Sequence, residues 1–186
     1  MITRILLAAA LLLPSVALAE VSPYAGQESR AIKALSQEDI EGLLQGNGMQ
    51  MAKPAELNSY PGPRHALDLA SELGLTSQQA AELERVRAQM AADAQRLGAE
   101  ILDAEEALDR LFAERTADPA TVDAIAQKIG AMQGRLRAVH LKAHLDTAAI
   151  LTPHQIREYD ALRGYTGTAS SGVPGGGAHK GGHGGH

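Results

Sequence analysis

The sequence predicts an all-α protein built on a long antiparallel helical hairpin with short flanking helices. Two observations support this fold class. The pentapeptides LTSQQ (75–79) and LTPHQ (151–155) each have the composition of a helix start. Between them, two stretches carry apolar residues at alternating steps of three and four, which places one narrow apolar stripe along each helix. The segment TADP (116–119) interrupts these stretches, and we expect the hairpin turn there.

Each pentapeptide is a capping box. The threonine at the N-cap can accept a hydrogen bond from the backbone N–H three residues on, and the glutamine at N3 can accept one from the N–H of the N-cap. The leucine before each threonine is placed to act as a hydrophobic staple, and Pro153 fills the first helical position, where its missing N–H costs nothing. The predicted capping residues are Thr76, Gln79, Thr152 and Gln155.

The two core helices are expected at 77–115 and 119–150. They would be about 58 and 48 Å long, well beyond the width of a small compact domain. A bare hairpin of this length leaves apolar surface exposed, so either dimerisation or a client-binding face is expected. Shorter helices are expected from Ser36 to Gly46, from Pro63 to Gly74 and over 153–163, and residues 46–63 are expected to be irregular.

Three glycines lie inside the predicted core helices, each at a cost of about 1 kcal/mol relative to alanine. If the hairpin folds about residues 116 and 117, Gly98 lies opposite Arg135 and beside Gly134, while Gly130 is one turn away. Two interpretations stay open. The glycines allow close approach of the two helices, or they form a flexible waist.

The two ends of the chain differ from the middle. Residues 1–19 have a positive start at Arg4, an apolar run and the cleavage motif ALA, so we expect a secretory signal peptide cleaved near Ala19. No later stretch is long and apolar enough for a membrane span. The expected organisation is an N-terminal arm with one short helix at 20–62, the helical-hairpin domain at 63–164 and a disordered Gly/His-rich tail at 165–186.

Composition excludes several classes of function. The chain has no cysteine, which rules out disulfides, thiol chemistry, cysteine-based zinc sites and a lipoprotein anchor. A net charge of −5 argues against nucleic acid as a partner. The sequence contains no nucleophile elbow, phosphate loop, dinucleotide fingerprint or zinc-protease helix. We therefore expect no enzyme activity, no catalytic residue and no required cofactor.

The seven histidines are the main candidate metal ligands in the sequence. His140 and His144 are four residues apart, so both imidazoles project from one helix face and could bind Zn²⁺, Cu²⁺ or Ni²⁺ together. The alternative is two half-exposed polar residues beside a dimer seam. In the tail, His179, His183 and His186 are set in glycine, which suits either metal capture of modest affinity or a passive solubilising role.

Two further features have simpler interpretations. Met49 and Met51 form an M-x-M pair that would suit Cu(I), although filling gaps in the core is the more ordinary role for methionine. His65, alone near a helix start, is expected to be structural.

The paired LTxxQ boxes on an exported, cysteine-free, helical chain resemble the Spy/CpxP family of periplasmic proteins, over about residues 64–163. That family takes in the zinc-associated chaperone ZraP, and the sensor CnrX resembles it in outline. The resemblance implies a periplasmic, curved, antiparallel homodimer. It also implies one of three roles: ATP-independent holding of unfolded proteins, restraint of a sensor kinase, or metal response. Sensor-type relatives tend to carry a His-x-x-x-His pair where this chain has His65 and Leu69.

Two functions are therefore expected. In the first, the protein binds unfolded clients in envelope stress on a face that includes Leu83, Val86, Met90 and Met132. In the second, it binds or senses heavy metals through the pair on the third core helix and the histidines of the tail. The two functions are compatible.

Overall fold

A computed structural model describes residues 21–165. The predicted signal peptide and the three tail histidines lie outside the described residues. The described chain folds into six helices, and no helix among these residues is long and apolar enough to cross a membrane. The helices are α1 (Gln37–Gln45), α2 (Lys53–Glu56), α3 (Pro63–Asp68), α4 (Ser77–Ala113), α5 (Pro119–Ile150) and α6 (Pro153–Leu162).

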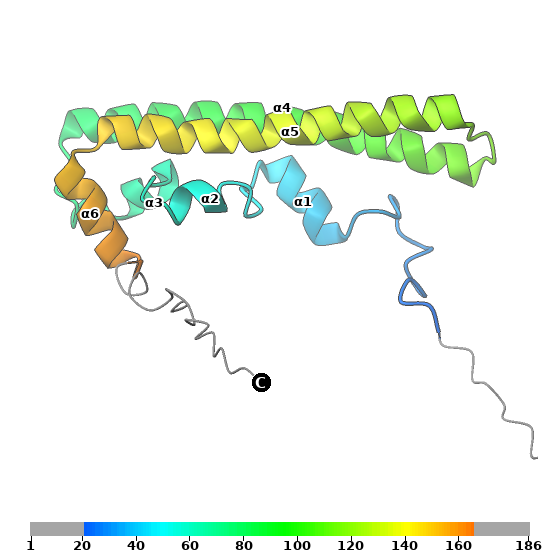
Figure 1. The fold of residues 1–186 in the computed structure, drawn as a ribbon, viewed down its shortest axis with the longest axis horizontal. Coiled ribbons are helices and arrows are strands. Elements are labelled where there is room, and N and C mark those ends of the chain that lie inside the picture. The colour runs from blue at the N-terminus through cyan, green and yellow to red at the C-terminus, as the bar shows by residue number, and fades with distance from the viewer. Residues whose placement is uncertain (1–20, 166–186) are drawn as a thin grey trace, which may run out of the picture.

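Helices α4 and α5 form the predicted antiparallel hairpin and lie side by side along their whole length (Figure 1). The bounds of α5 are as expected, but α4 ends two residues early because Arg115 adopts a left-handed conformation with φ 59° in the turn. Asp118 then caps α5 by accepting hydrogen bonds from the N–H groups of Ala120 (3.0 Å) and Thr121 (3.1 Å). The all-α hairpin fold is thus confirmed.

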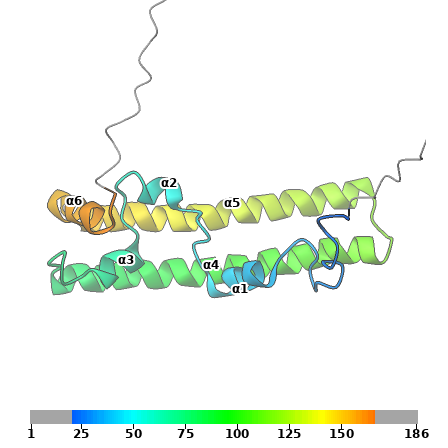
Figure 2. The same cartoon turned by 90° about the horizontal axis from the view of Figure 1, so that it is seen from below.

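The N-terminal arm, residues 21–62, lies along one face of the hairpin and touches both of its helices. Figure 2 shows α1 beside α4 and α2 beside α5, after which the chain crosses back to place α3 against α4. Helix α1 has the expected start at Ser36 and ends before Gly46, whose φ is 66°. The expectation of an entirely irregular segment at 46–63 was wrong, because it contains α2. Helix α3 is shorter than expected and gives way to turns before Gly74.

Two groups of buried apolar residues hold the hairpin. The turn-side core consists of Leu43, Ala94, Leu97, Ile101, Ala104, Ile129, Met132 and Leu136. The box-side core, at the end where the two capping boxes lie, consists of Ala66, Leu73, Leu83, Leu151 and Tyr159. On α5, His140 and His144 occupy the stretch between these two cores and are themselves buried.

Gly98 explains how α1 docks on the hairpin. A Cβ atom at this position would overlap the backbone carbonyl of Leu43, so only glycine lets α1 approach α4 this closely. At Gly130 and Gly134 a Cβ would meet nothing within 4 Å. A close backbone approach therefore exists at Gly98, where the element that approaches is α1, and the open space at Gly130 and Gly134 gives these two glycines no such role.

Candidate functional site

Both capping boxes have the predicted geometry. In the first, the N–H of Gln79 donates to Thr76 Oγ1 and the N–H of Thr76 donates to Gln79 Oε1, both at 3.1 Å. In the second, Gln155 donates to Thr152 Oγ1 at 3.2 Å and receives from the N–H of Thr152 at 2.9 Å. Each threonine–glutamine pair therefore satisfies two donors at a helix start.

The two boxes also bind each other across the open end of the hairpin. Gln79 Nε2 donates to Gln155 Oε1 at 2.9 Å, and Gln155 Nε2 donates to Gln79 Oε1 at 3.1 Å. The same amides reach the carbonyls of Ile150 (3.0 Å) and Leu73 (3.3 Å). The motif glutamines thus act as a paired amide bridge that joins the start of α4 to the start of α6.

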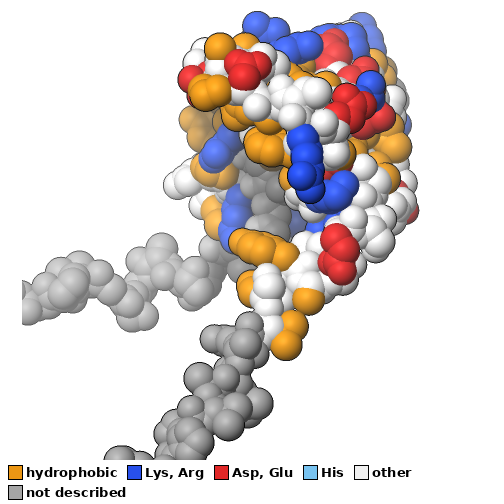
Figure 3. All heavy atoms as spheres, turned by 90° about the vertical axis from the view of Figure 1, so that its right-hand side faces the viewer, with side chains coloured by type: hydrophobic (Ala, Val, Ile, Leu, Met, Phe, Trp, Pro, Cys, Tyr) orange, Lys and Arg blue, Asp and Glu red, His pale blue; other side chains and the backbone are white. Residues whose placement is uncertain are grey.

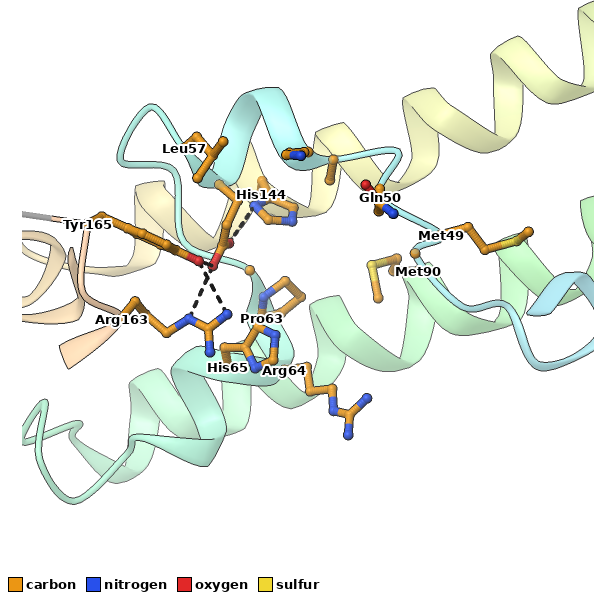
Figure 4. Close-up of a pocket in the computed structure, with 15 residues that line it drawn as sticks. Met49, Gln50, Leu57, Pro63, Arg64, His65, Met90, His144, Arg163 and Tyr165 are labelled. Carbon is orange, nitrogen blue, oxygen red and sulfur yellow. Dashed lines mark hydrogen bonds and ion pairs between the residues drawn. The ribbon is translucent and has the colours of Figure 1, made fainter. Parts of the chain in front are cut away.

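Next to this bridge lies a buried carboxylate that the sequence did not single out. Tyr159 Oη donates to Glu56 Oε1 at 2.6 Å, Tyr165 Oη donates to the same oxygen at 3.0 Å, and Arg163 Nε lies 3.4 Å from it. Burial, and then the bond to Glu56, raises the pKa of the Tyr159 phenol. In Figure 4, Arg163 and Tyr165 reach the cluster from the end of α6, and His144 reaches it from α5. This cluster fastens α2 to α5 and α6.

His144 is held by the arm in one tautomer. Its Nδ1 lies 2.7 Å from the carbonyl oxygen of Tyr60 and 3.7 Å from Glu56 Oε2. Since a carbonyl only accepts, Nδ1 carries the proton, and in the neutral ring Nε2 is the nitrogen left free to accept or to coordinate. Glu56 Oε2 accepts no hydrogen bond from the described residues.

His140 is more deeply buried than its partner. Its Nε2 makes no hydrogen bond among residues 21–165, and burial followed by the charge of His144 lowers its pKa. The alternative interpretation, two half-exposed polar residues beside a dimer seam, was therefore wrong about their exposure, because the arm covers them. A ring nitrogen that is buried and unpaired costs free energy unless something binds it.

The described residues supply only part of a metal-binding set. In the region that the structure describes, no group of three or more histidine, aspartate and glutamate side chains is placed to hold a metal ion. His65 lies apart from the pair, with its Nδ1 3.5 Å from Asp68 on a partly exposed surface. Within residues 21–165, the pair His140 and His144 therefore has no third histidine, aspartate or glutamate side chain placed to complete a metal site.

The arm and the hairpin enclose an open pocket of about 490 Å³, which we call the arm-side pocket. Its lining includes Met49, Leu57, Met90, His144 and Tyr165 (Figure 4). Met49 and the next residue both have positive φ, 41° and 62°, and this bend packs the Met49 side chain against Gly42. The two methionines in the lining, Met49 and Met90, have flexible side chains that can adapt to what the pocket binds.

A second depression of about 440 Å³, the hairpin groove, is lined only by residues of α4 and α5. Its lining residues are Arg85, Val86, Gln89, Met90, Asp93, Val139, Lys142, Ala143 and Asp146. No residue of the arm reaches it. Met90 also lines the arm-side pocket.

The four residues predicted to bind clients lie in two different environments. Leu83 and Met132 are 0% and 3% exposed, because they belong to the two cores, so their side chains do not face a partner in this conformation. Val86 and Met90 line the hairpin groove. Among the described residues, the large apolar side chains that are exposed are others, which the stripe pattern could not reveal: Val21, Tyr24, Leu44, Met49, Leu57, Tyr60, Phe112, Leu145 and Leu162.

Charge on the surface is mixed in sign. Viewed from the turn end of the hairpin, acidic and basic side chains are interspersed with hydrophobic ones (Figure 3). Ion pairs such as Arg96–Glu100 (2.8 Å) and Arg110–Glu106 (3.0 Å) run along α4.

Comparison with known protein families supports the resemblance that the two capping boxes indicated. Searches of curated proteins and of solved structures find no significant match. The sequence profile described as LTXXQ motif family protein matches residues 63–163, which run from the start of α3 to just past the end of α6 and contain both capping boxes. Because this match covers more than half of the chain, the protein belongs to the LTXXQ motif family, the family of Spy/CpxP-type proteins.

Proposed function

We propose that the protein is a periplasmic, ATP-independent chaperone-like protein that holds unfolded or partly folded clients during envelope stress. Membership of the LTXXQ family supports a periplasmic, non-enzymatic role. Members of this family are often homodimers, and we propose the same for this chain. Restraint of a sensor kinase is compatible with such a binding surface.

One observation carries the proposal: the arm side displays large apolar side chains around an open pocket. Leu57 is 55% exposed and Tyr60 42% exposed, and Met49 and Leu44 lie further along the same arm. The arm-side pocket opens beside Leu57, with methionine in its lining. Exposed apolar residues around an adaptable pocket suit weak contacts with many partly folded chains. We therefore place client binding on the arm side.

A scattering assay of a chemically denatured client, with and without the mature protein, tests this function. We expect suppression of aggregation at a stoichiometric ratio of dimer to client, and weaker suppression by Leu57→Gln. Leu145→Gln is the matched control, because Leu145 is 54% exposed but lines neither cavity. Absence of suppression by the unmodified protein at stoichiometric excess would refute the proposal.

A second candidate function is the binding of Zn²⁺, Cu²⁺ or Ni²⁺, favoured by the state of the buried histidines. Metal-binding histidines commonly donate one ring N–H to a backbone carbonyl, which directs the other nitrogen to the metal. His144 makes such a bond to Tyr60, and His140 has an unpaired Nε2. We propose that these two residues take part and that His179, His183 and His186 of the tail supply further ligands.

Calorimetric titration of the mature protein with each of the three ions tests the metal proposal. The comparison includes a variant that lacks residues 166–186, which keeps Tyr165 and its bond to Glu56, and the variant His140→Ala/His144→Ala. Tight binding that weakens in both variants is the expected result. Binding that is absent or millimolar in all three proteins would exclude a metal function, and the client assay would be unaffected.

A further inference from the structure

Helix α1 is held on the hairpin by few side chains. Of residues 21–60, only Ile32, Gly42 and Leu43 are buried. The ion pair between Lys33 Nζ and Asp109 Oδ2, at 2.9 Å, is half exposed on the lysine side and so adds little stability. Segments with few buried contacts open at a lower free energy than the rest of a protein. The part of the arm around α1 should therefore open while the hairpin stays folded.

The turn that follows α1 is built to act as a hinge. Gly46, Met49 and Gln50 have φ values of 66°, 41° and 62°. The turn leads to α2, which the bonds to Glu56 fasten to α6. Hinges are commonly a few loop residues that absorb changes in φ and ψ. Helix α1 can therefore turn away about residues 46–50 while α2 stays in place.

The surface beneath α1 consists of small residues of α4 (Figure 2). A Cβ atom at Gly46 would lie 3.1 Å from Ala94 Cβ and 3.2 Å from the carbonyl oxygen of Ala91. A Cβ atom at Gly98 would overlap the backbone of Leu43. Ala91, Ala94 and Gly98 are three and four residues apart, so they lie on one side of α4. We call these three residues the α1-binding face.

Helix α1 itself shows which kind of segment this face accepts. Its buried residues are Gly42 and Leu43, and Leu43 packs into the turn-side core. Its outer side is polar, because Gln37, Glu38 and Glu41 are exposed. Helix α1 is thus a short amphipathic helix with one anchoring leucine, held in the manner of a helical peptide in a groove.

Helix α1 lies outside the part of the chain that matches the family. The match covers residues 63–163, which contain α3, the hairpin and α6, and both α1 and α2 precede them. Helix α1 packs against α4 of this unit (Figure 2). In this chain an additional segment therefore covers one face of the family unit.

We propose that α1 is a displaceable cover, and that a client segment forming a short amphipathic helix takes its place on the α1-binding face. The inference rests on the proposed function and adds a second, covered surface to it. Clients first contact the exposed apolar residues of the arm, such as Leu57, and α1 then turns away. Because the closed arm competes with the client, the apparent affinity is lowered in proportion to the fraction of open molecules.

The closed arm also leaves a polar atom without a partner. A Cβ atom at Gly48 would lie 3.9 Å from His140 Nδ1, so the hinge turn lies beside this ring. The Nε2 atom of the ring is buried and makes no hydrogen bond among residues 21–165. A buried polar atom without a partner destabilises the state that buries it. Water that reaches the ring when the turn moves offsets part of the free energy of opening.

A cross-link between α1 and α4 tests whether α1 has to move. Gln95 Nε2 donates to the carbonyl of Gln45 at 3.4 Å, and both residues are exposed. Since the chain has no cysteine, a short bis-maleimide can join the two positions in Gln45→Cys/Gln95→Cys alone. The probe is fluorescein-labelled α-lactalbumin, reduced and carboxymethylated so that it stays unfolded, and fluorescence anisotropy gives its dissociation constant.

We expect the intramolecularly cross-linked chain to bind this probe at least about fivefold more weakly than the unmodified protein. The same variant capped with N-ethylmaleimide is the matched control, because it carries both modified cysteines without the link. It should bind the probe as the unmodified protein does. Equal affinity of the cross-linked and capped chains would overturn the inference.

Leu43→Ala tests the opposite direction. It removes the anchoring leucine and leaves the α1-binding face unchanged, so the probe should bind at least about fivefold more tightly. Glu41→Ala, on the exposed side of the same helix, is the control and should leave the affinity unchanged. Weaker or equal binding by a folded Leu43→Ala would show that α1 does not compete with the client.

Hydrogen exchange of the unmodified protein is a test that needs no variant. The amides of α1 should exchange faster in the presence of the probe, because a bound client holds the arm open. Amides at the centres of α4 and α5 should not exchange faster. Slower exchange of α1 would show that clients bind on top of the closed arm, and it would overturn the inference.

The results separate this inference from the proposed function. Absence of binding by the unmodified, cross-linked and Leu43→Ala proteins alike would overturn both. Binding by the unmodified protein that neither the cross-link nor Leu43→Ala changes would leave the chaperone proposal in place and overturn only the role of α1 as a cover.

Discussion

The two ends of the hairpin are held by different kinds of contact. Every member of the turn-side core is apolar, and α1 joins that core through the backbone contact at Gly98. At the box-side end, the polar residues Gln155, Thr147 and His144 are buried together with the apolar core. There, directional hydrogen bonds and the buried carboxylate of Glu56 tie four elements together.

This difference determines how each end responds to change. An apolar core depends on volume, so the loss of methylene groups or the addition of a methyl group alters the free energy of unfolding directly. A polar cluster depends on pairing, because a buried polar atom that loses its partner still has to be desolvated. The stability of the box-side end should therefore depend on the loss of a single side-chain amide or on the protonation of a single side chain. The stability of the turn-side end should not respond to such changes.

The largest effect is expected from Leu136→Ala in the turn-side core. Leu136 is 1% exposed, and removing a buried leucine side chain typically costs about 2–5 kcal/mol through lost burial and a residual cavity. Urea unfolding followed by circular dichroism measures the change. A loss below about 1 kcal/mol would show that the turn-side end collapses to fill the space, contrary to a tightly packed core.

Gly98→Ala should also destabilise, although alanine is the better helix former. The added Cβ meets the Leu43 backbone, which is not free to move aside, and overpacking of this kind costs about 1–3 kcal/mol. Gly134→Ala is the matched control in open space and should stabilise by about 0.5–1 kcal/mol. Thermal unfolding of both variants checks the opposite signs, and equal signs would contradict the docking of α1 on α4.

Gln155→Ala tests the amide bridge at the box-side end. It removes the side-chain oxygen that accepts from the N–H of Thr152 and leaves the side chain of Gln79 without its partner, for an expected loss of about 1–2 kcal/mol. A double-mutant cycle with Gln79→Ala should show a coupling of at least about 0.5 kcal/mol. Additive losses would mean that the two boxes act independently, as two separate caps.

The smallest expected effect is the pH dependence of the buried His140. Burial lowers its pKa, so below the ordinary histidine pKa of about 6.5 the unfolded chain binds more protons than the folded one. Stability should therefore fall as the pH drops through this value towards the lowered pKa of the folded state, and this contribution should be absent at higher pH. Melting temperatures at pH 7.5 and 5.5 should differ less in His140→Gln than in the unmodified protein. An unchanged difference would place the pH response on other groups.

Much of the fold was predictable because it depends on local chemistry. The starts of α4, α5 and α6 follow from Thr76, Asp118 and Thr152, and each helix contains the spacing of its own apolar stripe. The site was less predictable. Glu56 lies in an arm without periodicity, and nothing in its neighbourhood along the chain indicates that Tyr159 is its partner.

The sequence by itself determined the helix starts, the turn and the pairing of two long amphipathic helices, since capping and periodicity act over a few residues. Only the tertiary structure decided that the two glutamines bind each other, that Gly98 receives α1 instead of α5, and that the arm buries His140 and His144. These contacts join residues far apart in the chain, and they depend on which faces remain available after the hairpin has formed. The spacing of residues along one helix indicates on which face a side chain lies. It does not indicate which element covers that face, because that element comes from elsewhere in the chain.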